Sequence, residues 1–148
     1  MPKSYTNVEF KAEAKVTPGA NCGLFVRAAA SNGRARGYEA QIANSGDPLR
    51  KTGSLYVVRD VLQQLVPDDV WFTEHVIVVG NRIVIKVNNQ IVVDYVDAQS
   101  THASGRVALQ HQVAGKSVLY HNVMVRPLPA DDAAAWAEAR KSVTEVPV

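Results

Sequence analysis

Glu39 and Gln41 stand two residues apart in a stretch where apolar and polar residues alternate. Because successive side chains of a β-strand point to opposite faces, these two share one face, while Tyr38 and Ile42 share the other. The second face is apolar and is expected to form part of the core. The first then presents a carboxylate and a carboxamide about 7 Å apart, since a strand rises about 3.3 Å per residue.

Arg27 is a candidate third member of this polar patch. It shares a strand face with Phe25 and lies opposite Leu24 and Val26 in the alternation. If its strand neighbours that of Glu39, an Arg, a Glu and a Gln converge. Such a set suits a polyhydroxylated ligand, because a sugar presents alternating donors and acceptors that these planar groups can bracket. A surface salt bridge between Arg27 and Glu39 is the alternative.

A second set of polar residues interrupts a strand-like pattern later in the chain. Gln110 and Gln112 alternate with Leu109 and His111. We interpret His111 as a candidate general acid or base, because the ordinary pKa of histidine lies near neutrality. A histidine that is simply exposed or hydrogen-bonded is the alternative. Gln110 and Gln112 are candidate substrate contacts.

Three aromatic residues could provide a stacking platform for a sugar ring. They are Tyr56, Trp71 and Phe72. Most aromatic side chains of a small β-sandwich belong to its core, which is the alternative for each of them. Of the three, we predict Tyr56 to be a substrate contact.

The sequence lacks the catalytic motifs that recur across folds. Gly115-Lys116-Ser117 ends like a phosphate-binding loop, but Gln110 stands where such a loop requires glycine. The four histidines lack the helical pairing of a zinc protease, and a single cysteine, Cys22, excludes a thiolate zinc cage. We predict no cofactor and no metal ligands, and leave a divalent metal ion open.

Composition limits the class of protein. The 148 residues are 47% hydrophobic and 20% charged, with a net charge of +2, which is typical of one ordinary globular domain. So small a charge excess argues against a nucleic-acid partner. No apolar run approaches the roughly 20 residues of a membrane helix, and the first ten residues lack the apolar core of a signal peptide. Neither a nucleic acid nor a membrane is expected as a partner.

Short strands must position these side chains. Alternating or β-branched segments separated by Gly, Pro and Asn predict strands at residues 8–16, 23–28, 38–42, 55–58, 71–79, 83–87, 91–95, 106–112 and 118–125. Gly80-Asn81 and Asn88-Asn89 predict two successive hairpins, because asparagine and glycine tolerate the positive φ of tight turns. With no helical pattern between the strands, we expect an antiparallel sandwich or barrel.

The C-terminal segment differs from the rest of the chain. Residues 133–141 are rich in alanine, with Asp131-Asp132 before them and Arg140-Lys141 at their end. This charge order favours a helix, because acids stabilise its N-terminus and bases its C-terminus. We expect Trp136 to pack on the sandwich; a connector to a partner is the alternative. The chain is therefore divided into a sandwich, residues 1–128, and a C-terminal helix and tail, residues 129–148.

Several short motifs, in order along residues 4–128, resemble the 3-keto-disaccharide hydrolase domain family. The segment Pro18-Gly19-Ala20-Asn21-Cys22-Gly23-Leu24-Phe25-Val26-Arg27 is similar to that family's PGxNSGxFxR opening, with Cys22 in place of its serine. The other similar segments are Gly37-Tyr38-Glu39-Ala40-Gln41-Ile42, Lys51-Thr52-Gly53-Ser54-Leu55-Tyr56, Trp71-Phe72-Thr73-Glu74-His75, Gly80-Asn81-Arg82-Ile83, Asp94-Tyr95, Ala108-Leu109-Gln110 and His121-Asn122-Val123-Met124-Val125-Arg126-Pro127-Leu128.

This resemblance implies an all-β fold, an antiparallel jelly-roll β-sandwich of the concanavalin A-like type with a short C-terminal helix, and a sugar site on its concave sheet. It also implies an exported bacterial domain, periplasmic or extracellular, although this chain shows no signal peptide. A homodimer and a larger modular parent protein are both open.

The resemblance implies a glycoside oxidised at C3 as the substrate. A C3 ketone acidifies the C2 proton, so that a base can remove it and the C1 oxygen can leave by β-elimination before water adds. This route needs one base and an oxyanion stabiliser rather than two flanking carboxylates. Glu39 or His111 is the expected base, and Arg27 and Gln41 are expected to hold the keto and hydroxyl oxygens.

One departure from the family pattern concerns the histidine. The family reads Leu-Gln-x-His where this chain reads Leu109-Gln110-His111-Gln112, so His111 comes one residue early unless a β-bulge restores its position. Two other functions therefore stay open. One is a carbohydrate-binding module without catalysis, and the other is an assembly domain that pairs through an exposed sheet edge.

Overall fold

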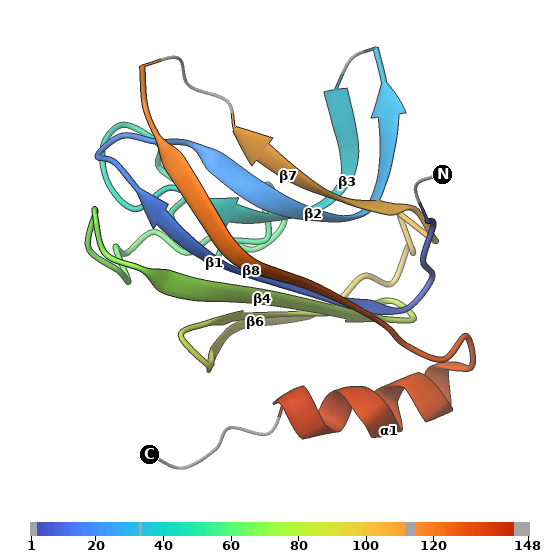
Figure 1. Ribbon diagram of the computed structural model, residues 1–148. Helices are drawn as coiled ribbons and strands as arrows, with labels where there is room; N and C mark the ends of the chain where they lie inside the picture. Colours follow the sequence, from blue (N-terminus) through green and yellow to red (C-terminus); the bar gives the residue numbers. More distant parts are fainter. Residues whose placement is uncertain (1–2, 33, 112–114, 144–148) are drawn as a thin grey trace.

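The computed structural model describes residues 3–32, 34–111 and 115–143, without the side chains of residues 31, 111 and 143 (Figure 1). This part of the chain forms eight strands and one helix. They are β1 (Val8–Val16), β2 (Cys22–Ser31), β3 (Arg34–Ile42), β4 (Phe72–Val79), β5 (Arg82–Val87), β6 (Gln90–Val96), β7 (Arg106–His111), β8 (Val118–Pro127) and α1 (Asp132–Val143).

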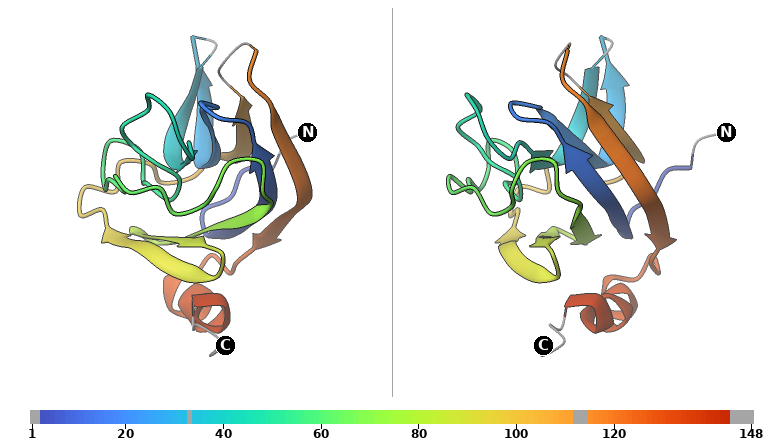
Figure 2. Two further views of the ribbon diagram at one scale, coloured as in Figure 1. Left: turned by 90° about the vertical axis from the view of Figure 1, so that its left-hand side faces the viewer. Right: turned by 60° about the vertical axis from the view of Figure 1, so that its left-hand side comes forward.

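Two antiparallel sheets face each other (Figures 1 and 2). The larger has the order β6-β5-β4-β1-β8 and the smaller has the order β3-β2-β7. The two predicted hairpins are present, since β4 pairs with β5 and β5 with β6. The predicted all-β jelly-roll sandwich with a short C-terminal helix is confirmed.

Alternation along β1 builds one wall of the core. Its apolar residues from Val8 to Val16 are at most 2% exposed, whereas the charged residues between them lie on the other face of the strand. The opposite wall consists of Cys22, Leu24 and Val26 of β2 and the apolar residues of β3, which lie in the same buried cluster. Removing this apolar surface from water is the main stabilising contribution to the sandwich.

Helix α1 covers the outer face of the five-stranded sheet (Figure 1). Trp136 packs there beside a buried cluster that joins sheet and helix: Ile77, Val79, Val84, Leu128, Ala135 and Ala139. The Arg82 guanidinium lies 4.0 Å from the centroid of the Trp136 ring. The expectation that Trp136 packs on the sandwich is confirmed. Within the described residues, no helix has the length and apolar character needed to cross a membrane.

The strand predicted at residues 55–58 is wrong. Leu55 makes only isolated bridges, to Ala40 and to Arg59, and Val57 has a φ of 57°. The chain turns back on itself here, because the N–H of Arg59 donates to the carbonyl of Leu55. The N–H of Tyr56 donates in turn to the Glu39 carbonyl, so this turn borders the edge of β3.

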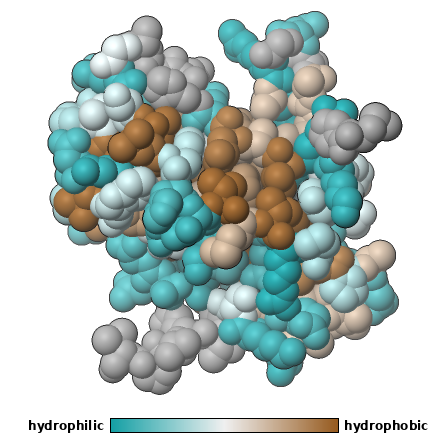
Figure 3. Space-filling view, in the orientation of Figure 1, coloured by the Kyte–Doolittle hydropathy of each residue, from teal (hydrophilic) through white to brown (hydrophobic). Residues whose placement is uncertain are grey.

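The sandwich is open along the side formed by β7 and β8, which are end strands of different sheets. Leu109 pairs with the buried Leu24 and Val125 with the buried Phe10, so both are on inward faces. They are nevertheless 40% and 37% exposed. Figure 3 shows hydrophobic side chains gathered in the middle of the face seen in Figure 1. The smaller sheet leaves the inner face of β8 partly uncovered.

Candidate functional site

A cavity of about 720 Å³ lies against the three-stranded sheet, on the face turned away from the core. Polar and ionisable residues from several parts of the chain line it: Asn21, Arg34, Arg36, Glu39, Gln41, Tyr56, His102 and Gln110. Its apolar lining includes Phe25 and Ala108. A cavity of this size suits a small ligand.

Strand order brings the predicted polar residues together. Gln41 of β3 and Gln110 of β7 both pair with Gly23 of β2, so they form one row across the sheet. Glu39 of β3 pairs with Phe25 of β2, which forms the next row on the same face. Antiparallel partners share a face, so the two glutamines and Glu39 point to the same side.

Glu39 is an unusual carboxyl group because it is only 8% exposed. Burial raises its pKa from 4.5 to about 7. At neutral pH a substantial fraction is therefore ionised and able to accept a proton, while the rest can donate one. A carboxyl group with a pKa near the working pH is well suited to general acid–base catalysis.

Gly23 provides the space that this carboxylate occupies. A Cβ at position 23 would lie 2.5 Å from Oε2 of Glu39 and 2.9 Å from the carbonyl oxygen of Ala40. Any larger residue at position 23 would therefore displace the carboxylate or the strand.

Gln41 is held in one orientation. Its side chain is 2% exposed, and its Nε2 donates to Oδ1 of Asn21 at 3.1 Å and to the carbonyl of Arg50 at 3.4 Å. Asn21 also lines the cavity, which the sequence did not lead us to expect. With both amide protons of Gln41 used, its Oε1 is the atom that can accept a hydrogen bond from a ligand.

The expected convergence of Arg27 with Glu39 and Gln41 is wrong. Arg27 and Ala28 stand together opposite Gly37, a β-bulge in which Arg27 has a φ of 50°. The bulge shifts the alternation, so that the Arg27 side chain leaves the cavity face.

The Arg27 guanidinium is instead buried among backbone carbonyls. It donates to those of Thr6 at 2.7 Å, Gly80 at 2.6 Å and His102 at 3.0 Å, and it is 3% exposed. Burial is the main cause that lowers its pKa. Arg27 thus ties the N-terminal segment, the β4–β5 turn and the loop before β7 together, and it forms no ion pair with Glu39.

His102 also lines the cavity, which the sequence did not predict. The His102 ring packs edge-on against the Tyr38 ring, with centroids 4.8 Å apart. The backbone N–H of His102 donates to the Tyr38 hydroxyl. That hydroxyl donates to Oδ2 of Asp97 at 2.6 Å. Burial, helped by the charge of Arg27 and opposed by that of Asp97, lowers the pKa of His102 and favours its neutral form. Because the loop that carries it has no regular pattern, periodicity gave no signal for it.

The three aromatic candidates do not form one platform. Tyr56 lines the cavity and is 41% exposed, with the Arg50 guanidinium 5.6 Å from its ring centroid. Phe72 is part of the core. Trp71 lies instead beside His121 at a second, shallower cavity of about 580 Å³. Only Tyr56 is placed to stack on a ligand in the first cavity.

The predicted histidine and its neighbour fall at the limit of the described structure. Gln112 lies outside the described residues. The backbone of His111 ends β7 and pairs with Cys22, one register position beyond the row of Gln41 and Gln110. Its side chain also lies outside the described part. No group of three or more His, Cys, Asp or Glu residues able to hold a metal ion occurs in the part of the chain that the structure describes.

Two further ionisable groups lie in the sandwich interior. Glu74 is fully buried, and neither carboxylate oxygen has a hydrogen-bond partner among the described residues. Burial, assisted by the charge of Glu39, raises its pKa well above 4.5 and favours its neutral form. Burial likewise raises the pKa of Cys22 to about 12, so this thiol is not a nucleophile.

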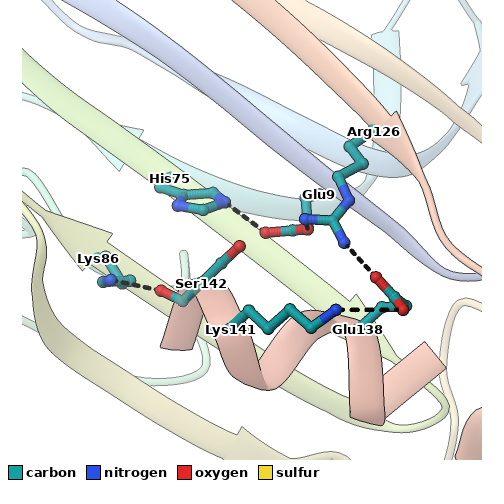
Figure 4. A network of polar contacts seen from close by, with 7 residues as sticks. All are labelled: Glu9, His75, Lys86, Arg126, Glu138, Lys141 and Ser142. Carbon is teal, nitrogen blue, oxygen red and sulfur yellow. Dashed lines mark hydrogen bonds and ion pairs between the residues drawn. The ribbon is translucent and has the colours of Figure 1, made fainter. Parts of the chain in front are cut away.

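A second polar cluster lies on the outer face of the five-stranded sheet (Figure 4). Glu9, which is 4% exposed, accepts a hydrogen bond from Nε2 of His75 at 3.0 Å and pairs with Nη1 of Arg126 at 3.1 Å. Lys86 donates to the carbonyl of Ser142, near the end of α1. The contacts of Lys86 with Ser142 and of Arg126 with Glu138 join the sheet to α1, so this cluster anchors the helix.

Solved structures confirm the fold. Two proteins from Parabacteroides distasonis ATCC 8503 that are named as glycosyl hydrolases superpose with a TM-score of 0.73, at 16% and 19% identity. The alignments cover 86% and 85% of this chain and 72% and 80% of those chains. The carbohydrate-binding module CBM66 from Bacillus subtilis superposes with a TM-score of 0.64 at 15% identity, covering 84% of this chain and 77% of that one.

No curated protein sequence matches the chain. The sequence model of the 3-keto-alpha-glucoside-1,2-lyase-like domain, however, matches residues 1–126, which contain β1 to β7, all of β8 except its last residue, and every residue that lines the cavity. The resemblance found in the short motifs is thereby confirmed, and the chain belongs to the 3-keto-alpha-glucoside-1,2-lyase-like domain family, a carbohydrate-related family.

Proposed function

We propose that this domain cleaves 3-keto-glycosides by elimination, with Glu39 as the base. The observation that carries the proposal is the nearly buried Glu39 carboxylate, which lines the cavity with a pKa of about 7. Family membership supports the substrate class. A single carboxylate is sufficient, because the C3 ketone makes the C2 proton acidic.

The reaction begins when Glu39 removes the proton from C2 and the electron pair forms an enolate whose negative charge lies on the C3 oxygen. The enolate then re-forms the ketone, a C1–C2 double bond appears, and the bond from C1 to the glycosidic oxygen breaks. The leaving oxygen takes up a proton. Addition of water across C1–C2 completes release of a 3-keto-monosaccharide.

The amide groups around Glu39 have distinct roles in this proposal. Oε1 of Gln41 accepts a substrate hydroxyl, because the Gln41 amide nitrogen is already bonded to Asn21 and Arg50. The Gln110 amide lies in the same row as Gln41, on the other side of Gly23, and contacts the keto oxygen in place of Arg27. Stabilisation of the developing oxyanion by such a donor accelerates the proton transfer.

A second proton-transfer group is needed for the leaving oxygen and for the attacking water. His102 lines the same cavity as Glu39, so it is our first candidate. The protonated Glu39 is an alternative proton donor. His111 stays a candidate base on its sequence position alone, and the two histidines can be separated by substitution.

The test is product formation from a defined substrate pair. A 3-keto-disaccharide and its unoxidised parent sugar are incubated with the protein, and release of 3-keto-monosaccharide is followed by mass spectrometry. We expect cleavage of the oxidised sugar only, and its loss in Glu39→Gln. Glu13→Gln, which removes a carboxylate of β1 outside the cavity lining, is the matched control. Full activity of Glu39→Gln would exclude Glu39 as the base.

Sugar binding without cleavage is the second candidate function. It is favoured by the similarity of the fold to a carbohydrate-binding module. In that case the keto-disaccharide binds to the folded protein, no product forms, and Glu39→Gln changes affinity alone.

A further inference from the structure

One wall of the cavity is the outer half of the β2–β3 hairpin, which rises from the sandwich in Figure 1. The bulge at Arg27 and Ala28 marks the place where the hairpin leaves the sheet. A Cβ at Gly37, opposite the bulge, would lie 2.6 Å from the carbonyl oxygen of Val26. Bulges bend the strand that carries them, so the Arg27 bulge directs this hairpin toward the cavity.

Arg34 and Arg36 of the raised hairpin line the cavity and are exposed. Three other arginines, Arg50, Arg82 and Arg126, each pair with a carboxylate. Within the described part of the chain, neither Arg34 nor Arg36 forms an ion pair. Since the whole chain carries a net charge of only +2, this wall is a local concentration of positive charge.

The two cations are separate from the base. Among the described residues that line the cavity, Glu39 is the only Asp or Glu, and its pKa is governed by burial. Had an arginine been in contact with this carboxylate, its charge would have lowered that pKa. The cavity therefore has a carboxylate at its floor and uncompensated guanidinium groups on its hairpin wall.

We propose that the cavity takes an acidic sugar, whose carboxylate binds Arg34 and Arg36 on the hairpin wall while the ring to be cleaved lies against Glu39. The assignment of the cleaved ring rests on the proposed function, whereas the charge preference does not. A guanidinium group presents a planar fork of donors that matches a carboxylate, and a sulfate would be bound by the same chemistry. A uronic acid is the natural carrier of a carboxylate on a sugar.

The test compares two unoxidised disaccharides that differ in one group, cellobiouronic acid and cellobiose, by isothermal titration calorimetry at low salt. Wild-type protein is expected to bind the uronate about tenfold more tightly, as charge-assisted hydrogen bonds allow. Arg34→Gln/Arg36→Gln should abolish this preference. Lys15→Gln/Arg106→Gln, which removes two positive charges outside the cavity lining, should retain it. A sulfated cellobiose tests whether any oxyanion is accepted.

Equal affinity for the two sugars overturns the proposal, and so does a preference that survives in the Arg34/Arg36 variant. The proposal is also overturned if neither sugar binds measurably. Cleavage of 3-keto-cellobiose and of 3-keto-cellobiouronic acid is assayed separately. If either keto sugar is cleaved and no uronate preference is found, only the charge proposal fails. If the uronate is preferred and no keto sugar is cleaved, the elimination proposal fails and the acidic-sugar site stands.

Discussion

Gly23 and Glu39 share one space, because a Cβ on residue 23 would lie 2.5 Å from the Glu39 carboxylate oxygen. We therefore expect Gly23→Ala to displace the carboxylate and lower kcat/KM for a 3-keto-disaccharide by about 10- to 100-fold, since small displacements of a catalytic group are costly. In a Glu39→Gln background the same substitution should cost much less. Equal losses in both backgrounds would mean that Gly23 acts through the strand and not through Glu39.

The pKa of Glu39 predicts the pH dependence of activity. Only the ionised carboxylate can accept the C2 proton, so kcat/KM should rise with pH and level off above about 7. A profile that levels off near 4.5 would assign the base to an exposed carboxyl group. A rise through about 7 that persists in Glu39→Gln would assign it to a histidine.

The same group predicts how stability changes with pH. A carboxyl group whose pKa is raised on folding binds more protons when folded, so the folded state loses stability as pH rises from 4.5 through about 7. The loss is on the order of 3 kcal/mol. Glu39→Gln removes it, and the variant should gain stability relative to wild type between pH 5 and pH 8 in urea unfolding. A pH-independent difference between the two proteins would contradict the burial of this carboxylate.

Arg27 should act on stability and not on sugar contact. Its guanidinium satisfies three backbone carbonyls, and loss of these bonds should lower the free energy of unfolding by about 2 to 4 kcal/mol. Arg27→Lys should also be destabilising, since an ammonium group cannot reproduce the planar fork. Thermal unfolding measures the effect. A lysine variant of wild-type stability that binds sugar more weakly would return Arg27 to the ligand site.

The polar cluster of Glu9, His75 and Arg126 should hold α1 on the sheet. Burial opposes ionisation of Glu9, but hydrogen bonds from His75 and Ser142 and the charges of His75 and Arg126 outweigh it, so its pKa is lowered. Its stabilising contribution is present above the ordinary pKa and is lost as pH falls through the lowered one. Glu9→Gln should cost about 1 to 3 kcal/mol.

The fluorescence of Trp136, measured in a Trp71→Phe background, reports whether the helix stays in place. Glu9→Gln should shift its emission to longer wavelength. The control, Glu138→Gln, removes a partner of Arg126 that is 45% exposed and should cost less than about 1 kcal/mol. Equal effects of the two variants would contradict a special role for Glu9.

The open edge of β8 predicts self-association at high concentration, because an unpaired strand with exposed apolar side chains is a template for another strand. Val125→Lys should keep the protein monomeric in light scattering over a concentration series. Val96→Lys, on the opposite end strand β6, is the control, since Val96 is 57% exposed. If Val96→Lys alone removes association, the edge at β6 is responsible.

Much of the fold followed from local patterns. The strands, the two hairpins and the helix depend on residues a few positions apart, so alternation, turn residues and charge order were sufficient to predict them. The placement of Glu39 and Gln41 on one face of a strand was predicted from the same alternation. The strand prediction for residues 55–58 was wrong because the apolar residues of this segment fit the strand pattern while its backbone turns.

The sequence by itself predicted the sandwich class, the family resemblance and four residues that line the cavity, Glu39, Gln41, Tyr56 and Gln110. The tertiary structure decided which other side chains reach Glu39. Gln110 joins it because β7 pairs with β2, and His102 because its loop packs on Tyr38. Arg27 leaves it because one extra residue in a strand reverses the faces of all that follow. Strand partners and bulges depend on contacts between distant segments, which a period of two residues does not encode.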